Sequence, residues 1–505
     1  MWKPFVLLLL FTSSYHQICA QVFPKEGSSL CYRLIGFSFP AGASVTQYKL
    51  EIATGSYSNA ADFEKNIVKS VSCKKSKVIT EVPYFGCQYT WRVIPAGSKA
   101  VVTKDVLHHF SVKITQDVDS ASTRLRIISP AEKYKDAYVF IDGARALYDM
   151  NGKPVWFLPG TELKVNQKAY PRDLKPTPQG TITFLTNGDA YEITYGGNIV
   201  WRTQVTNQSV KHFHHEFTRL RNGYYMGMLS ELSDNNYLKL LSFKDSIAHN
   251  ANDSARFYRR AWINSLVEYD PKGNLVWRWD GYNYLMKSDL IGEQKADSSF
   301  DLNDLHENAF FFDEINKVVY VSFRNINRVI KIKYPEGTIL NTYGAKYAPG
   351  VQDMHNELFC GQHSCRKSQK GYLYLFNNNV CNASHIPTIV MLQEPPEGKS
   401  ELKKIWEYQC TVENPEVMTV ENSNFLSGGN VVELPDQSIF VSMGSPYCKV
   451  FIVGTDKKVL WSAISEKYNS GKERWELFSQ LNVYRASMIS RKDLEELIWN
   501  SEKYE

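Results

Sequence analysis

Short runs of alternating apolar and polar residues, separated by turn residues, fill the first part of the chain. SVTQYKLEI, YTWRVIPAG and HHFSVKITQ are examples, and Gly, Pro, Ser and Asn lie between such runs. Alternation with a period of two is typical of β-strands that bury one face. The pattern predicts a small β-sandwich domain over residues 21–125.

A different pattern begins near residue 126 and repeats. Six times, a turn-like element leads into an apolar or Trp-bearing strand, as in YDMNGKPVW and GTDKKVLW. One such β-sheet cannot bury both of its faces alone, so repeats of this kind stack around an axis as propeller blades. The sequence therefore predicts an all-β protein with a six-bladed β-propeller over residues 126–465. The six strands end at Trp156, Trp201, Trp277, Leu340, Trp406 and Trp461.

The two ends of the chain differ from this β pattern. Residues 466–505, with KERWELFSQL and SRKDLEELIW, have apolar positions at helical spacing and predict a short helical C-terminal tail. Residues 1–20 combine Lys3, an apolar run over 5–11 and Ala20, which predicts a cleaved signal peptide. That run is too short to span a bilayer, and no later stretch is apolar enough. We therefore expect a secreted protein without a membrane span, extracellular in a eukaryote or periplasmic in a bacterium.

Cysteines and glycosylation motifs agree with export. Nine cysteines are present, and cleavage of the signal peptide would remove Cys19 and leave an even number, which favours disulfide bonds whose pairing the sequence does not give. Asn-x-Ser sequons begin at Asn207, Asn252 and Asn382 and predict a glycoprotein. The net charge of +5 is mild for this length and permits anionic ligands, but no basic block or motif indicates a nucleic acid partner.

Histidines recur at one position of the repeat. His215 stands eight residues before Gly223, and His363 stands eight before Gly371. His306 precedes a similar turn, near Asn316, and is interpreted as the equivalent residue of a third blade. Equivalent positions in a propeller surround one end of its central channel, so these imidazoles are expected to converge. Alternation along the strand would direct the neighbouring His214 to the opposite side.

Other polar residues are expected on the same face. Arg172 stands eight residues before Gly180 in the first of these units, Arg324 ends the strand VSFRN, and Asn308 follows His306 closely. Guanidinium, amide and imidazole groups together suit a tetrahedral oxyanion. Three alternatives stay open: structural histidines, a remnant of duplication without chemistry, and a zinc site. The arginines and the lack of a fitting acidic partner argue against zinc, so no metal is expected.

The segments that carry these residues resemble the arylsulfotransferase family. They are HHEF at 214–217, LHENAFFFDEINKVVYVSFRNINRVIKI at 305–332 and GQHSCRKSQKGYLYLFNNN at 361–379. The resemblance implies a six-bladed propeller with a small N-terminal β-domain. It also implies ping-pong transfer of a sulfuryl group from an aryl sulfate to a phenol through a sulfohistidine, without a nucleotide donor or another cofactor.

Residue roles follow from the same resemblance. His363 is similar to the attacking histidine, and the sulfate oxygens and phenolic proton are handled by His215, His306, Asn308 and Arg324. The assignment of Arg172 to the site rests on its repeat position alone and not on the resemblance. The chain departs from the family where Phe376-Asn377-Asn378-Asn379 stands in place of an Asp-containing end. Cys360 and Cys365 beside His363 are expected to brace its loop through one or two disulfides.

Two other functions compete with a sulfotransferase. A non-catalytic secreted propeller that binds an extracellular ligand or matrix component would keep the scaffold, because one fold hosts many functions. A metalloenzyme is the second. The sequence does not decide the oligomeric state, and a homodimer stays open.

Overall fold

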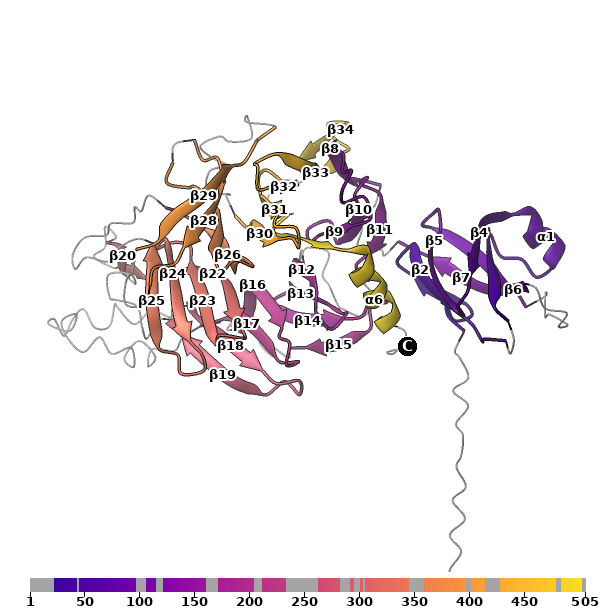
Figure 1. Cartoon of the computed structure of the whole chain (residues 1–505), viewed down its shortest axis with the longest axis horizontal. Coiled ribbons are helices and arrows are strands. Elements are labelled where there is room, and N and C mark those ends of the chain that lie inside the picture. Colours follow the sequence, from indigo (N-terminus) through magenta and orange to yellow (C-terminus); the bar gives the residue numbers. More distant parts are fainter. Residues whose placement is uncertain are drawn as a thin grey trace, which may run out of the picture. The chain divides into compact units, whose positions relative to one another are not determined.

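The computed structural model consists almost entirely of β-strands (Figure 1). It describes residues 22–42, 45–96, 106–114, 121–159, 171–203, 211–232, 262–281, 291–294, 300–302, 305–344, 358–382, 384–396, 401–413, 427–477 and 483–501. The predicted signal peptide and the sequons at Asn207 and Asn252 lie outside these residues. Backbone contacts divide the chain into two units, Met1–Lys113 and Ile114–Glu505. The sequence pattern predicted the boundary between the two domains at residue 125, whereas the contacts divide the chain after Lys113.

The first unit contains two sheets that share an aromatic core. Phe37 of the smaller sheet packs against Trp91 and Phe110 of the larger one, with ring centroids 5.2 and 5.9 Å apart. Two sheets packed in this way form the small β-sandwich that the alternation predicted. The larger sheet has the order β1 (Ser28–Leu30), β7 (His108–Val112), β6 (Cys87–Ala96), β3 (Gln47–Thr54) and β4 (Ile67–Cys73); β2 (Leu34–Ser38) pairs with β5 (Lys77–Glu81), and α1 spans Ala60–Lys65.

Among its described residues, the second unit contains six antiparallel sheets with at least four strands each. Their strands, in sheet order, are β35 (Ala486–Ile489), β9 (Tyr138–Ile141), β10 (Ala146–Asp149) and β11 (Pro154–Phe157); β12 (Arg172–Pro176), β13 (Ile182–Thr186), β14 (Asp189–Ile193) and β15 (Ile199–Arg202); β16 (Lys211–Arg219), β17 (Tyr225–Leu232), β18 (Trp262–Tyr269) and β19 (Leu275–Asp280); β22 (Glu307–Asp313), β23 (Val318–Phe323), β24 (Arg328–Lys333) and β25 (Ile339–Gly344); β26 (His363–Lys367), β27 (Leu373–Asn377), β28 (Thr388–Gln393) and β29 (Lys403–Gln409); and β30 (Asn430–Glu433), β31 (Ile439–Ser442), β32 (Lys449–Val453) and β33 (Val459–Asn469). Two further strands, β34 (Arg474–Leu477) and β8 (Thr123–Ser129), also pair with β33. A separate hairpin consists of β20 (Ile291–Gln294) and β21 (Phe300–Leu302).

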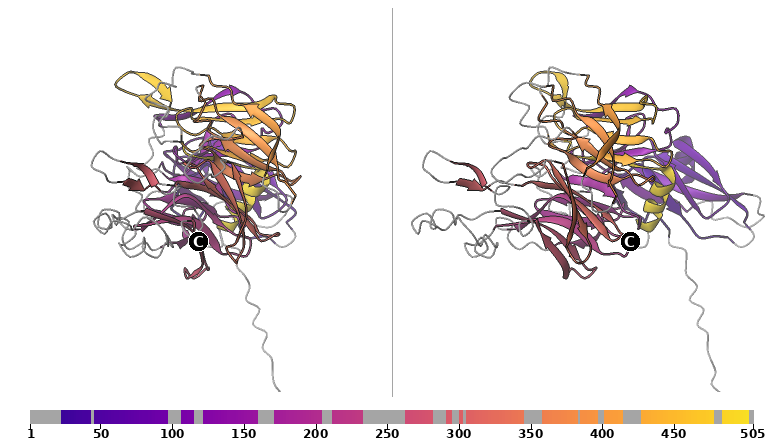
Figure 2. Two further views of the ribbon diagram at one scale, coloured as in Figure 1. Left: turned by 90° about the vertical axis from the view of Figure 1, so that its left-hand side faces the viewer. Right: turned by 60° about the vertical axis from the view of Figure 1, so that its left-hand side comes forward.

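The first strands of these sheets form a closed ring. β35 contacts β12, which contacts β16, and the contacts continue through β22 and β26 to β30, while β31 contacts β35 (Figures 1 and 2). This is the β-propeller arrangement, as the repeat predicted. Six sheets of this kind lie among the described residues, and the number of blades in the whole chain stays a prediction.

The repeated Trp positions join neighbouring sheets. All six repeat residues lie in the fourth strand of a sheet: β11, β15, β19, β25, β29 and β33. The Trp156 indole N–H donates to the Tyr195 carbonyl, at 2.8 Å, in the turn before the fourth strand of the next sheet. Trp277 does the same with Pro335, and Trp461 closes the ring by donating to Met150. Three of the six repeat residues therefore bond to the neighbouring sheet, whereas the Trp406 indole N–H has no partner among the described residues.

The end of the chain differs from the predicted helical tail. A helix, α6, spans Arg491–Ser501 as predicted, but β34 and β35 precede it. Trp475 of β34 lies beneath the Arg124 guanidinium, 4.1 Å from its ring centroid, and against Tyr468. These tertiary contacts outweigh the helix propensity of the segment. Along β35, Ala486–Ile489 pair with Ile141–Tyr138, so the C-terminal strand completes the first sheet.

No described helix has the length and hydrophobicity needed to cross a bilayer. A disulfide joins Cys360 to Cys381, whereas Cys365 is a buried free thiol. The expected brace therefore forms through Cys360 and not through Cys365.

Candidate functional site

Backbone irregularities mark the first strands of four successive sheets. Strand pairing shifts after Arg172 in β12, after His214 in β16, after Glu307 in β22 and after His363 in β26. At or beside these shifts, Asp173, His215, His306 and Ser364 have φ between 51° and 58°. Left-handed backbone is uncommon for such residues, and bulges of this kind redirect side chains next to functional sites. The irregularities therefore mark the places where these strands can redirect polar side chains.

Two of the expected histidines are in direct contact. His215 Nε2 lies 3.0 Å from His306 Nε2, so one of these two nitrogens carries the shared proton. His214 Nδ1 also lies 2.5 Å from His215 Nδ1. The expectation that His214 points to the opposite side is wrong, because the bulge between His214 and Phe217 interrupts the alternation.

His306 reaches this contact from a different strand position than expected. The Phe217 amide donates to Asp173 of the preceding sheet, and the Phe310 amide donates to Glu216 of its own preceding sheet. Phe217 and Phe310 therefore occupy equivalent positions in the repeat. His215 and Asn308, each two residues earlier, are equivalent to one another in the same way. His306 lies one residue before β22, so the three histidines converge without occupying equivalent positions.

His363 is held in one orientation by two neighbours. Its Nδ1 lies 2.7 Å from the Asn378 Oδ1, and the Asn378 amide in turn donates to the Gly428 carbonyl at 3.2 Å. Because Asn378 presents its oxygen, the ring proton belongs on Nδ1, and the lone pair belongs on Nε2. The Gly428 N–H donates to that Nε2 at 3.3 Å, a long hydrogen bond. The His363 lone pair therefore lies on the nitrogen opposite Asn378, where it accepts this long hydrogen bond.

Tyr484 connects these histidines. Its ring centroid lies 5.7 Å from that of His215 and 6.1 Å from that of His363, and the Arg172 guanidinium lies 5.0 Å from it. The side chain is buried, and its hydroxyl has no hydrogen-bond partner among the described residues. Burial raises the pKa of Tyr484 to about 12, so the hydroxyl is a neutral donor. Sequence reasoning missed this residue because its segment was interpreted as helical tail.

Asn308 and Arg324 complete the group. Asn308 is fully buried and donates from Nδ2 to the Gln362 carbonyl at 2.7 Å, whereas its Oδ1 has no partner among the described residues. Arg324 directly follows β23, and its amide donates to the His306 carbonyl at 3.0 Å. The Arg324 charge acts on His363, where it lowers the imidazole pKa.

The two central imidazoles are neutral at physiological pH. Burial, followed by the charges of His306, His214, Arg172 and His363, lowers the pKa of His215 well below 6.5. Burial and then Arg324 lower the pKa of His363 in the same way, against a smaller opposite effect of Asn378. A neutral imidazole keeps the lone pair that nucleophilic or general-base chemistry needs.

A buried network of ion pairs contacts the strands that carry these residues. The fully buried Arg485 bridges Asp173 at 3.0 Å and Glu216 at 3.1 Å, and it donates to the Asn308 carbonyl at 2.9 Å. Burial alone would raise the pKa of Glu216, but the charges of Arg366, Arg485 and Lys175 together lower it to about 2. Arg485 therefore joins strands that carry Arg172, His215 and Asn308.

Asp142 anchors the segment that supplies Tyr484 and Arg485. Its carboxyl group accepts the backbone N–H groups of Tyr484 at 3.0 Å and of Arg485 at 2.7 Å. Burial raises the pKa of Asp142 to about 7, against the opposite effect of these hydrogen bonds. Sequence reasoning missed Asp142 and Arg485, because neither stands at a repeated position.

All six site residues expected from the sequence lie in described segments. Direct hydrogen bonds, ring contacts or electrostatic effects connect His215, His306, His363, Arg172 and Arg324, partly through Tyr484. Asn308 joins through Arg485 and through Gln362, the residue before His363. Within the described ranges, no three His, Cys, Asp or Glu residues are grouped so as to hold a metal ion.

Comparisons with known proteins point to one family. The family model described as arylsulfotransferase (ASST) matches residues 113–424. No curated protein sequence matches the chain. Similar solved structures include a protein of unknown function from Bacteroides caccae, with 11% identity, a TM-score of 0.39 and coverage of 73% of this chain and 99% of that one. A streptogramin B lyase has 9% identity and a TM-score of 0.35, with coverage of 73% and 98%.

Proposed function

Because this chain belongs to the arylsulfotransferase family, whose model matches residues 113–424, we propose that it moves a sulfuryl group from an aryl sulfate to a phenol through His363. The observation that carries the proposal is the orientation of His363. Asn378 holds the Nδ1 proton, which leaves the lone pair on Nε2, where it accepts a long hydrogen bond of 3.3 Å from the Gly428 N–H beside the Tyr484 ring.

In the first half of the reaction, His363 Nε2 attacks the sulfur of the aryl sulfate. An N–S bond forms, the bond from sulfur to the phenolic oxygen breaks, and the phenolate leaves with the electron pair. The imidazole ring then carries a positive charge beside the bound sulfuryl group. The Asn378 Oδ1, 2.7 Å from Nδ1, stabilises that charge by accepting the N–H.

The contact between His215 and His306 supplies the proton that the leaving phenolate needs. For this step the pair carries one proton in addition to the proton shared between the two nitrogens, which are 3.0 Å apart, and transfer of the additional proton to the phenolate leaves both imidazoles neutral. In the second half, an acceptor phenol returns this proton to the pair. Its oxygen attacks the sulfur, the N–S bond breaks, and neutral His363 is regenerated.

Charge on the sulfuryl oxygens requires donors that are already in place. Arg324 and Arg172 bring positive charge to His363 and His215, and the Tyr484 hydroxyl is an uncommitted buried donor. Donors fixed in a buried site contribute more to transition-state stabilisation than the same groups in water. The roles of Arg172 and Tyr484 rest on this geometry, whereas Asn308 and Arg324 also match the family pattern.

We further propose that the protein is secreted. The disulfide between Cys360 and Cys381 supports this location, because such bonds persist mainly in oxidising compartments.

Turnover of p-nitrophenyl sulfate with a second phenol tests the proposed function. Wild-type protein should release nitrophenol and sulfate the acceptor, and His363→Asn should do neither. His109→Asn, in the separate N-terminal unit, is the matched control and should retain activity. A folded wild-type protein with no more release than His363→Asn would instead support a non-catalytic ligand-binding propeller.

A further inference from the structure

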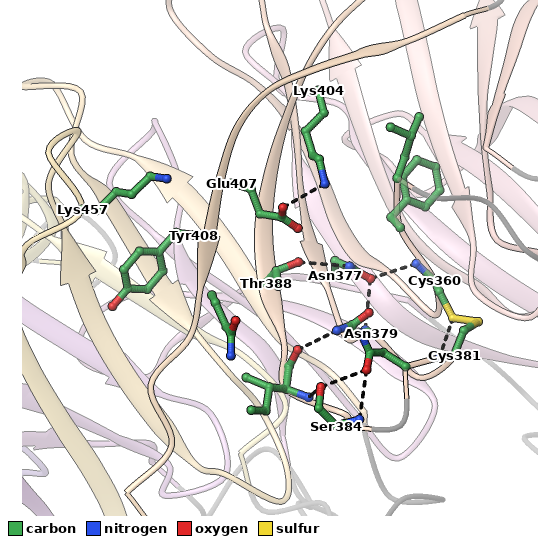
Figure 3. A pocket seen from close by; sticks show the side chains of 15 residues that line it. Cys360, Asn377, Asn379, Cys381, Ser384, Thr388, Lys404, Glu407, Tyr408 and Lys457 are labelled. Atoms are coloured by element: carbon green, nitrogen blue, oxygen red, sulfur yellow. Dashed lines mark hydrogen bonds and ion pairs between the residues drawn. A yellow bond between two sulfur atoms is a disulfide. The ribbon is translucent and has the colours of Figure 1, made fainter.

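A polar cavity lies beside the loop that carries the expected disulfide brace (Figure 3). Its volume is about 770 Å³, within the range of roughly 300–1,000 Å³ that is typical of small-molecule sites. Asn379 and Ser384 line one part, and Lys404, Glu407 and Tyr408 of β29 line another (Figure 3). The lining is rich in amide, hydroxyl and charged groups and includes an aromatic ring.

Asn377 and Asn378 separate this cavity from the candidate active site. Asn377 lines the cavity, where its Oδ1 accepts the Cys360 N–H at 2.8 Å and its Nδ2 donates to Thr388. The next residue, Asn378, instead contacts His363. The cavity is therefore a second site, and its lining includes none of the proposed catalytic residues.

One residue of the lining is a potential attachment point. Asn382 lines the cavity, is exposed and begins an Asn-x-Ser sequon. Its Oδ1 accepts hydrogen bonds from the Ser384 N–H at 3.0 Å and from the Ser384 hydroxyl at 3.1 Å. Its Nδ2 makes no hydrogen bond within the described residues. The hydroxyl that the sequon requires is thus already beside the amide, and the nitrogen that would be modified is accessible.

We propose that Asn382 carries an N-linked glycan whose first sugars occupy this cavity. The Asn382 Nδ2 loses a proton and forms a bond to the anomeric carbon of N-acetylglucosamine, while the bond from that carbon to the pyrophosphate of a lipid-linked donor breaks. Hydroxyl and acetamido groups of the sugars pair with the polar lining, and the Tyr408 ring provides a face for them. The Cys360–Cys381 disulfide, adjacent to Asn382, is consistent with passage through a compartment where such glycans are added.

Attachment is tested on the full chain secreted from animal cells. Enzymatic deglycosylation in heavy-oxygen water should convert Asn382 to labelled aspartate, detected by peptide mass spectrometry. Ser384→Thr keeps the sequon and should retain the sugar, whereas Ser384→Ala should lose it. An unmodified Asn382 in the secreted wild-type chain would overturn the proposal.

Docking is tested by the rate at which an endoglycosidase trims the glycan. Cleavage of a docked glycan must wait for undocking, so a contact worth about 1.4 kcal/mol slows it roughly tenfold. We expect release from Asn382 to be at least about tenfold slower in the native protein than in the unfolded protein. Glu407→Ala, which removes one lining carboxylate, should accelerate it. Equal rates for native and unfolded wild-type protein would show that the sugars lie outside the cavity.

Discussion

The His363 imidazole and the Asn378 side-chain amide are hydrogen-bond partners, with Nδ1 and Oδ1 2.7 Å apart. The family resemblance predicted that a carboxylate is lost from this part of the chain, and the structure shows an amide oxygen that fixes the imidazole tautomer. An amide does this without the negative charge that would raise the pKa of His363. The lone pair on Nε2 is therefore available over a wider range of pH.

Replacement of Asn378 by Asp tests this relationship. A carboxylate beside His363 should raise the imidazole pKa by roughly 1–3 units, because an opposite charge favours the protonated form. The acid limb of the kcat/KM profile should move to higher pH, and activity should recover as pH rises. Asn378→Leu, which cannot hold the tautomer, should lower kcat by roughly 10–100-fold at every pH. An acid limb that stays in place in Asn378→Asp would contradict this role.

Stability should depend on pH through the buried histidines. The folded-state pKa of His363 lies well below 6.5, so the folded protein binds fewer protons than the unfolded chain. The stability contributed by neutral His363 is present above pH 6.5 and falls by up to about 1.4 kcal/mol per pH unit below it. Urea unfolding at pH 7 and pH 5.5 should show a smaller loss for His363→Gln than for wild type. Asp142, whose pKa of about 7 has the opposite effect, contributes equally to both proteins. Equal losses would contradict the assignment.

Arg485 should be essential for stability. Replacement by Met leaves the carboxylates of Asp173 and Glu216 buried without this partner and should cost about 3–5 kcal/mol of unfolding free energy. Arg474 pairs with Glu476 at the surface, where its side chain is 66% exposed. The matched change Arg474→Met should therefore leave the free energy of unfolding almost unchanged. Denaturant midpoints of the two variants measure the difference, and similar midpoints would show that the network is not stabilising.

The disulfide should stabilise the loop next to His363. Cys360 and Cys381 are 21 residues apart, and closing a loop of that size contributes about 3 kcal/mol in the chain-entropy account. Cys360→Ser should lower the Tm and weaken the protection of residues 360–381 against hydrogen exchange. Cys73→Ser, in the N-terminal unit, is the control and should leave that protection unchanged. Unchanged protection in Cys360→Ser would contradict the proposal that this disulfide stabilises the loop.

Features that depend on residues close together in the chain could be predicted from the sequence, and features that depend on distant segments could not. The Trp repeat was visible because its residues all lie in the fourth strand of a sheet, where three of the indoles make a similar bond to the neighbouring sheet. His215 and His363 were found from their distance to a turn glycine. Tyr484 and Arg485 carry no such signal, since they enter the site only when β35 returns to pair with β9. His306 was found for a partly wrong reason, because Asn308 holds the equivalent strand position.

The most direct test of the central claim is the site of the covalent intermediate. The protein is mixed with an aryl sulfate in the absence of acceptor, quenched at alkaline pH and digested for mass spectrometry. We predict one sulfuryl group on the peptide that contains His363, removed when a phenol is added before quenching and absent from His363→Asn. A sulfuryl group on a peptide without His363, in an enzyme that still turns over, would contradict the assignment of the nucleophile.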